Sequence, residues 1–269
     1  MVRAKGDPMK TCRPAITALC VLSSLVLAPT LAKAAPEEIQ VYMDELGPKG
    51  GYGLDVHMNY TADGRKAPTY GGEMASDNRW RITPEWAYGL TDNVELGLYL
   101  PLATIDNSGK LELGGVKGRI KYIAPRAEGQ NWFWGTNFEI GRVRKSYDIN
   151  PWNAELKAIA GYRAGPWTVA GNLNIGWMVS GPDHTPVSYT LATKVAYAVS
   201  DKTSLGIENY NEFADASGVG RLGDRDQQVF AVIDRTMGDW DLNLGVGYGY
   251  GAPEDRWVIK AMVGVPFGK

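Results

Sequence analysis

The sequence predicts an all-β protein: a single antiparallel up-and-down transmembrane β-barrel of about 12 strands, preceded by a cleaved signal peptide. Three observations support this prediction. Large apolar residues alternate with small or polar residues along most of the chain, short turns alternate with longer polar loops, and Trp and Tyr gather at the ends of the alternating stretches. Together these features are typical of strands that face lipid on one side and a polar interior on the other.

The stretch WRITPEWAYGLTDNVELGLYL shows the alternation most clearly. Trp80 and Trp86 fall on one face, whereas Arg81 and Glu85 fall on the other, because successive side chains of a strand point to opposite faces. Residues 91–93 read Thr-Asp-Asn, and Asp and Asn favour tight turns. We therefore predict a hairpin with one apolar and one polar face.

The same pattern recurs along the chain and predicts 12 strands of about 11 residues, the length that a tilted strand needs to cross a bilayer. Residues 226–237 alternate less regularly than the others. The centres of the predicted strands are residues 52–60, 80–90, 94–100, 116–122, 132–140, 152–162, 167–177, 189–197, 205–207, 226–237, 240–248 and 257–267.

The connections favour a membrane barrel over a soluble sandwich. Short turns near residues 91–93 and 200–202 alternate with longer loops near residues 62–77 and 213–225. Outer-membrane barrels have short periplasmic turns and long extracellular loops. In lipid every backbone group needs a partner within the protein, so the sheet is expected to close, with both of its ends on the periplasmic side.

The first residues predict export. A basic start, a short apolar run and Ala-Lys-Ala at residues 32–34 indicate a signal peptide over residues 1–34, with translation beginning at Met1 or Met9. Cys12 and Cys20 both lie in it, so the mature chain has no cysteine. Residues 35–49 are expected to form a periplasmic strap or a segment that enters the lumen rather than a further strand, and residues 50–269 the barrel.

Composition argues against several functions. Removal of residues 1–34 leaves 23 basic and 29 acidic residues, a formal charge of about −6, so nucleic acid is not an expected partner. The chain has two histidines, His57 on an inward face and His184 in a loop, with no serine on the strand of His57. The sequence therefore predicts no enzyme, no cofactor and no metal site. Outer-membrane lipid and a small-molecule solute are the expected partners; the oligomeric state is left open.

Charged residues of both signs occupy inward positions, and these are the candidate site residues. A barrel of about 12 strands lies between small filled barrels and wide porins, so opposed charges are expected to pair and narrow its lumen. The predicted function is a narrow pore for small solutes. The alternatives are a non-conducting structural or surface-interaction barrel and an outer-membrane lipid hydrolase. The candidates are Asp55, His57, Arg81, Glu85, Glu95, Lys117, Arg119, Lys121, Glu139, Glu155, Lys157, Lys194, Glu208 and Lys260.

Four segments carry a resemblance to a known family: EIQVYMDELGPKGGYGLDVHMNY (38–60), RITPEWAYGLTDNVELGLYLPL (81–102), KYIAPRAEGQNWFWGTNFEIGRV (121–143) and DRWVIKAMVGVPF (255–267). The chain resembles Gram-negative outer-membrane barrels labelled as outer-membrane proteins of a phenol-degradation meta-pathway. The resemblance spans nearly the whole mature chain. It implies a passive outer-membrane barrel connected with the uptake of small organic molecules, and it supplies no catalytic motif.

Overall fold

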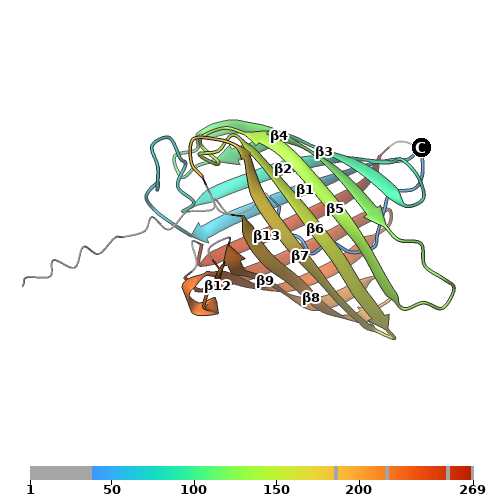
Figure 1. Cartoon of the computed structure of the whole chain (residues 1–269). Coiled ribbons are helices and arrows are strands. Elements are labelled where there is room, and N and C mark those ends of the chain that lie inside the picture. The colour runs from blue at the N-terminus through green and yellow to red at the C-terminus, as the bar shows by residue number, and fades with distance from the viewer. Residues whose placement is uncertain (1–37, 185–186, 216–217, 253–254, 268–269) are drawn as a thin grey trace, which may run out of the picture. The chain divides into compact units, whose positions relative to one another are not determined.

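The structure is a computed structural model that describes residues 38–184, 187–215, 218–252 and 255–267. Within these residues the chain forms one antiparallel sheet in which twelve long strands close into a barrel (Figure 1). The last strand pairs with the first from Tyr52↔Phe267 to Asp63↔Trp257, which closes the sheet. The predicted fold is therefore confirmed, whereas the predicted signal peptide lies outside the described residues.

The barrel strands follow one another around the sheet in chain order, and a two-residue strand, β10 (Gly218–Val219), pairs with β9 alone. The long strands are β1 (Tyr52–Asp63), β2 (Arg79–Gly89), β3 (Val94–Ile105), β4 (Leu111–Ile123), β5 (Trp132–Val143), β6 (Trp152–Ala164), β7 (Trp167–Ser180), β8 (Ser188–Ser200), β9 (Thr203–Asp215), β11 (Asp226–Met237), β12 (Trp240–Gly251) and β13 (Trp257–Phe267).

The outer surface of the barrel is apolar. Leu96, Ile120, Leu173 and Leu244 are exposed on β3, β4, β7 and β12, although a soluble protein would bury such residues. Their neighbours in sequence point inward and are mostly polar. A closed sheet satisfies its backbone hydrogen bonds internally, and an aliphatic outer surface is what a barrel needs in order to lie in lipid.

Aromatic pairs on neighbouring strands form a belt at each end of the barrel. Near the short turns, the ring centroids of Tyr52 and Tyr88 lie 4.9 Å apart. Near the long loops, those of Tyr60 and Trp80 lie 4.6 Å apart. Amphipathic rings at both ends match the two membrane interfaces.

Helical structure is minimal in the described part of the chain, where the element η1 (Leu222–Asp224) is a single 3-10 turn. Over the same residues, the structure has no helix with the length and apolar character to span a membrane.

Candidate functional site

Residues 38–49 run through the lumen as an extended segment, which we call the lumen segment, and its backbone is bonded to the barrel wall. The Tyr42 N–H donates to Oδ1 of Asn172 at 2.6 Å, and Nδ2 of Asn172 donates to the Tyr42 carbonyl at 2.9 Å. On the other side, Nζ of Lys260 donates to the Ile39 carbonyl at 3.0 Å. The wall thereby supplies the partners that a buried, non-helical backbone requires.

The second half of the lumen segment is held by residues of β3 and β4. Nζ of Lys121 donates to the Glu45 carbonyl at 2.8 Å, and the Gly47 N–H donates to Oε2 of Glu95 at 2.5 Å. Beyond it, Lys49 forms a bridge with Gly89 at the end of β2. The last residues of the segment therefore lie at the end of the barrel that carries the short turns.

Tyr42 is the central side chain of the lumen. Its hydroxyl lies 2.8 Å from the hydroxyl of Tyr99 and donates to Oε1 of Glu139 at 3.1 Å. Its ring lies near two ammonium groups, with Nζ of Lys157 at 4.8 Å and Nζ of Lys121 at 5.2 Å from the ring centroid. A cation beside an aromatic face is attracted to it, so the wall binds Tyr42 through both its hydroxyl and its ring.

Glu139 on β5 forms ion pairs with basic side chains from both neighbouring strands. Nζ of Lys157 on β6 lies 2.6 Å from its Oε1, and Nζ of Lys117 on β4 lies 3.7 Å from its Oε2. Lys157 also forms an ion pair with Glu155. These pairs follow from the register, which places neighbouring strands' inward residues side by side.

Arg119 joins two acidic residues of β2 and β3. It forms an ion pair with Glu85, and its Nη2 donates to Oε1 of Glu95 at 2.7 Å. All three side chains are almost fully buried. Burying a charge without a partner is costly, so the paired arrangement is what allows these residues to lie in the lumen.

A second network lies on the opposite wall. Glu208 on β9 forms an ion pair with Lys260 on β13, and Nζ of Lys194 on β8 lies 3.2 Å from its Oε1. Lys194 also contacts Asp234 of β11 at 2.8 Å, and the Tyr210 hydroxyl donates to Oε2 of Glu208 at 2.7 Å. Charged networks thus hold the lumen segment from two sides.

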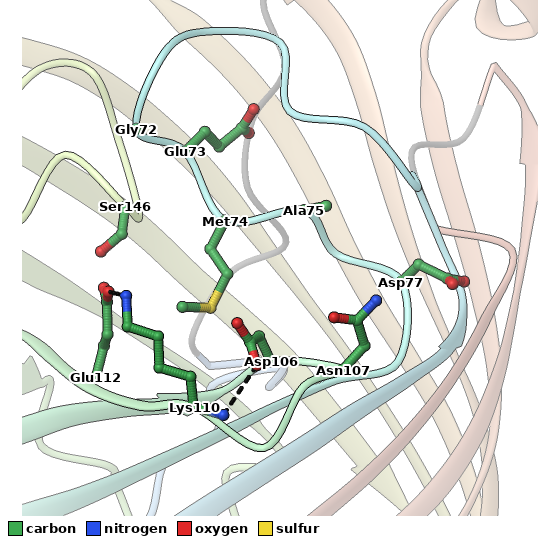
Figure 2. A pocket seen from close by; sticks show the side chains of 10 residues that line it. All are labelled: Gly72, Glu73, Met74, Ala75, Asp77, Asp106, Asn107, Lys110, Glu112 and Ser146. Carbon is green, nitrogen blue, oxygen red and sulfur yellow. Dashed lines mark hydrogen bonds and ion pairs between the residues drawn. The ribbon is translucent and has the colours of Figure 1, made fainter.

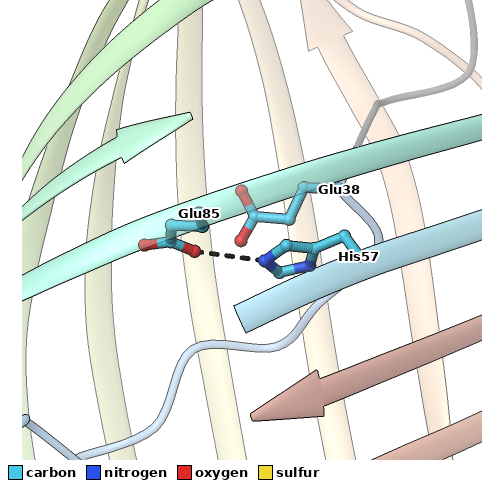
Figure 3. A group of neighbouring side chains, drawn as sticks. All are labelled: Glu38, His57 and Glu85. Carbon is cyan, nitrogen blue, oxygen red and sulfur yellow. Dashed lines mark hydrogen bonds and ion pairs between the residues drawn. The ribbon is translucent and has the colours of Figure 1, made fainter. Parts of the chain in front are cut away.

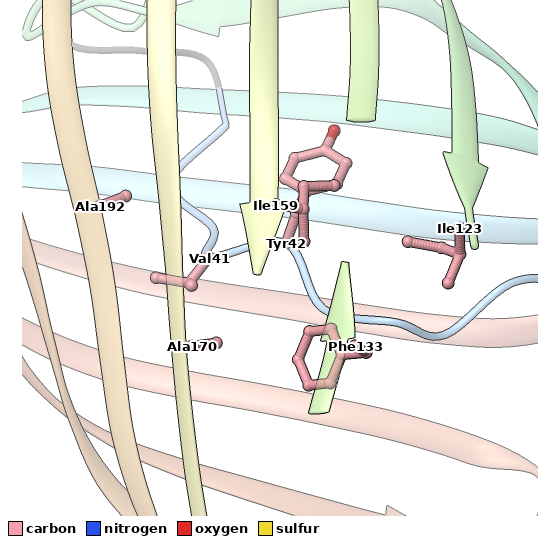
Figure 4. Close-up of a cluster of buried hydrophobic side chains, with 7 residues drawn as sticks. All are labelled: Val41, Tyr42, Ile123, Phe133, Ile159, Ala170 and Ala192. Atoms are coloured by element: carbon pink, nitrogen blue, oxygen red, sulfur yellow. The ribbon is translucent and has the colours of Figure 1, made fainter. Parts of the chain in front are cut away.

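Apolar wall residues complete the packing around the lumen segment. Val41 and Tyr42 pack in a cluster with Ile123, Phe133, Ile159, Ala170 and Ala192 (Figure 4). Ile39 packs in a second cluster with Phe230, Val232 and Val258. Phe230 and Val232 are apolar residues at inward positions, which explains why the alternation of residues 226–237 is weak.

Asp44 and Glu45 lie toward the short-turn end of the barrel and bind arginines there. Nη1 of Arg126 lies 2.9 Å from Oδ2 of Asp44, and Arg163 forms ion pairs with Asp44 and with Glu45, the latter at 2.9 Å. These pairs anchor the lumen segment at this end.

All fourteen charged residues predicted to line the lumen point inward. Asp55, Lys117 and Glu155 are half-buried and the other eleven are buried. Most of them are brought together in the two networks described above. Arg81 lies apart, on β2 opposite Asn59 and Thr104, nearer the long loops. His184, the other histidine of the chain, is exposed in a loop.

Sequence reasoning missed Glu38, Tyr42, Tyr99 and Asn172 as site residues. Tyr99 and Asn172 are inward residues of the wall, but neither is charged. Glu38 and Tyr42 precede the first strand, so the alternation of inward and outward residues along a strand cannot assign them to the lumen. The signal that could have found them is the set of apolar inward residues, such as Phe133 and Phe230, which need an apolar partner inside the barrel.

Glu38 meets His57 of β1 and Glu85 of β2 in the lumen (Figure 3). Nε2 of His57 lies 3.1 Å from Oε2 of Glu85, and one ligand atom from each of the three residues lies within 4.8 Å of the others. An imidazole and two carboxylates are ligand types that hold metal ions in proteins.

Comparisons with known proteins identify the type of barrel. No family model matches the sequence, and neither does any curated protein. An outer-membrane channel from Pseudomonas putida F1 is similar in structure, with a TM-score of 0.60 and 16% identity over 86% of this chain and 100% of that one. The NanC porin has a TM-score of 0.50 and 10% identity over 80% of this chain and 100% of its own. The chain has the fold of an outer-membrane β-barrel.

Outer-membrane barrels have their short turns in the periplasm. We therefore expect the short-turn end, where the lumen segment meets β1, to face the periplasm, and the loop that joins β1 to β2 to lie outside the cell. Glu73 in this loop binds Arg65 at 2.5 Å and the Thr69 N–H at 2.5 Å. Burial raises the pKa of Glu73, but the bonds from Arg65 and Thr69 outweigh burial and hold that pKa below its usual value.

A pocket of about 230 Å³ opens between three of the long loops at this end of the barrel (Figure 2). Glu73, Asp106, Lys110 and Glu112 are among its lining residues. The Lys110 N–H donates to Oδ1 of Asp106 at 2.9 Å, and its Nζ donates to Oε1 of Glu112 at 2.6 Å. The acidic groups here thus already have partners within the loops.

Proposed function

We propose that the protein is a narrow outer-membrane pore for small solutes, restricted by the lumen segment and by the ion pairs that hold it. The observation that carries this proposal is that several charged side chains stay partly exposed inside a lumen that also holds the lumen segment. The side chains of Glu155 and Asp234 are each 32% exposed and that of Lys117 is 21% exposed, although all three lie on inward faces. Water therefore reaches charged groups beside the lumen segment, as a conducting path requires.

The resemblance to the meta-pathway family supports small organic molecules as the solute class. Lys117 and Glu155 stay partly exposed and offer contacts to the polar parts of such solutes, whereas the apolar cluster around Val41 and Phe133 is buried against the lumen segment. Aromatic compounds of this kind are the solutes that we propose.

Two other functions compete with the pore. A hydrolase would need a hydroxyl nucleophile bonded to its histidine, whereas the described bond of the His57 ring goes to the carboxylate of Glu85. We therefore propose that the barrel is not a hydrolase. A non-conducting barrel that acts through its loops would tolerate a lumen filled by its own chain, so conductance separates that function from the pore.

Ion selectivity tests the proposal. Replacing Lys117, Arg119 and Lys121 together with Ser removes the basic side of one network and leaves Glu85, Glu95 and Glu139 to set the field of the lumen. The reversal potential in a salt gradient is then expected to shift toward cation selectivity. An unchanged reversal potential in a folded, conducting variant would show that ions do not pass this network.

A further inference from the structure

The cluster of Glu38, His57 and Glu85 joins the lumen segment to the barrel wall. His57 and Glu85 lie on adjacent strands at inward positions, and their side chains are 3% and 2% exposed. Glu38 reaches the same point from the lumen segment, and its carboxylate faces the His57 ring (Figure 3). Three potential ligands from two separate parts of the chain therefore converge in a buried position.

One oxygen of Glu38 lacks a partner. Oε1 of Glu38 is buried and accepts no hydrogen bond from the part of the chain that the structure describes. A buried carboxylate oxygen left unsatisfied costs free energy, and native proteins usually provide a proton donor or a cation in such places.

The charge of the surrounding network points to a cation. Six carboxylates lie together here: Glu38, Asp55, Glu85, Glu95, Glu139 and Glu155. Four basic side chains face them: Lys117, Arg119, Lys121 and Lys157. The formal charge is −2 while His57 is neutral, and a single divalent cation would balance it.

The ligand set selects the type of cation. Ca²⁺ and Mg²⁺ favour sites made of oxygen alone, whereas imidazole nitrogen suits Zn²⁺ and its transition-metal neighbours. Zn²⁺ bonds of about 2.0–2.2 Å in a tetrahedral site place two ligand atoms about 3.4 Å apart, close to the 3.1 Å between Nε2 of His57 and Oε2 of Glu85. We propose that Glu38, His57 and Glu85 bind a divalent transition-metal ion, with Zn²⁺ as the best fit.

Arg119 is placed to orient one of these ligands. It binds Oε1 of Glu85, which leaves Oε2 directed at the cluster. Carboxylates that bind metals are commonly held in this way by a hydrogen bond to their second oxygen. Because Glu38 belongs to the lumen segment, the bound metal would also fasten that segment to β1 and β2.

Zinc binding to the folded barrel tests the proposal. The tag-free barrel in detergent is treated with a chelator, equilibrated with ZnCl₂ and analysed for bound zinc, with thermal unfolding as a second measurement. We expect one zinc per wild-type barrel and a higher unfolding temperature with zinc. E38Q and H57Q, which keep the size of each side chain approximately, should each bind zinc more weakly by at least the roughly 10- to 100-fold that loss of a residue supporting a ligand costs.

Two control variants locate the site. E128Q changes an exposed glutamate in the turn between β4 and β5, outside this network, and H184Q removes the other histidine of the chain; both should keep wild-type zinc binding. Heat-dependent gel mobility verifies that each variant is folded. Absence of bound zinc in the wild type, or equal binding by the wild type and a folded E38Q/H57Q double variant, would overturn the proposal and leave His57 as the ion-pair partner of Glu85. Zinc binding does not depend on conductance, so this result is independent of the pore.

Discussion

Lys157 on β6 places its Nζ atom 2.6 Å from Oε1 of Glu139 on β5, and both side chains are buried. Lys110, in the loop before β4, and Glu112, at the start of β4, have the same separation of 2.6 Å, but the lysine side chain is 63% exposed. The two pairs differ in surroundings rather than in geometry. Buried ion pairs lose far more than exposed ones when one partner is removed, because the other is left as an unpaired charge.

Lys157→Met is therefore expected to lower the free energy of unfolding by about 3–5 kcal/mol. Lys110→Met should leave it unchanged within error. Urea titration of the barrel refolded into lipid vesicles measures both. Equal effects of the two substitutions would mean that water screens the lumen network as it screens the loops.

Leu244→Arg tests the lipid-facing surface. Leu244 lies in the middle of β12 and is 39% exposed on the outside of the barrel. Arginine near the bilayer midplane should lower the free energy of unfolding by about 2–4 kcal/mol. Val219→Arg, at an exposed position in the short strand β10, should lower the free energy of unfolding much less. A similar loss at both positions in urea titrations would contradict a lipid-facing position for Leu244.

Cysteine labelling tests the direction of the barrel. A cysteine at Asn107, between β3 and β4, should react on intact cells with a thiol reagent that does not cross membranes. A cysteine at Asp92, in the turn between β2 and β3, should react only after the outer membrane is opened. Wild-type protein gives the background labelling. The opposite labelling pattern would show that the long loops face the periplasm and the short turns face outward.

The lowered pKa of Glu73 predicts that the stability of the loop between β1 and β2 depends on pH. Burial raises its pKa and the bonds from Arg65 and Thr69 lower it further than burial raises it, so the folded pKa lies below the unfolded one. The contribution of Glu73 to loop stability is therefore fully present above the unfolded pKa and is lost as pH falls through the folded pKa.

Amide hydrogen exchange of the loop in wild type and Glu73→Gln measures this effect. The wild type should be better protected at neutral pH, and the difference should vanish at acidic pH. Comparing the two proteins at each pH cancels the intrinsic pH dependence of exchange. A difference that persists unchanged in acid would show that the charge of Glu73 does not hold the loop.

Strands and their inward faces could be predicted because lipid and lumen impose a period of two on each strand. That period places Lys157 and Glu139 inward, and antiparallel pairing makes them neighbours. The start of β4 at Leu111, before the predicted residue 116, was less clear because Gly114 and Gly115 interrupt the apolar face.

The path of the lumen segment could not be predicted in the same way. Tyr42 is 130 residues from Asn172 in sequence, and a contact of this range is set by closure of the barrel rather than by local pattern. Glu38 joins His57 only once the lumen segment is in place. The proposed metal ligands therefore could not be predicted from the sequence, in which the two histidines are isolated from each other.

Single-channel conductance in planar bilayers, compared between the wild type and Tyr42→Ala, tests the restricted pore most directly. Tyr42 contacts Glu139, Tyr99 and the cations of the wall, so its removal should open the lumen and raise the conductance of each channel. Tyr197→Ala, on the outer surface, should leave conductance unchanged. We predict small conductance steps for the wild type and larger ones for Tyr42→Ala; no conductance in either protein, with both folded as barrels, would contradict the pore.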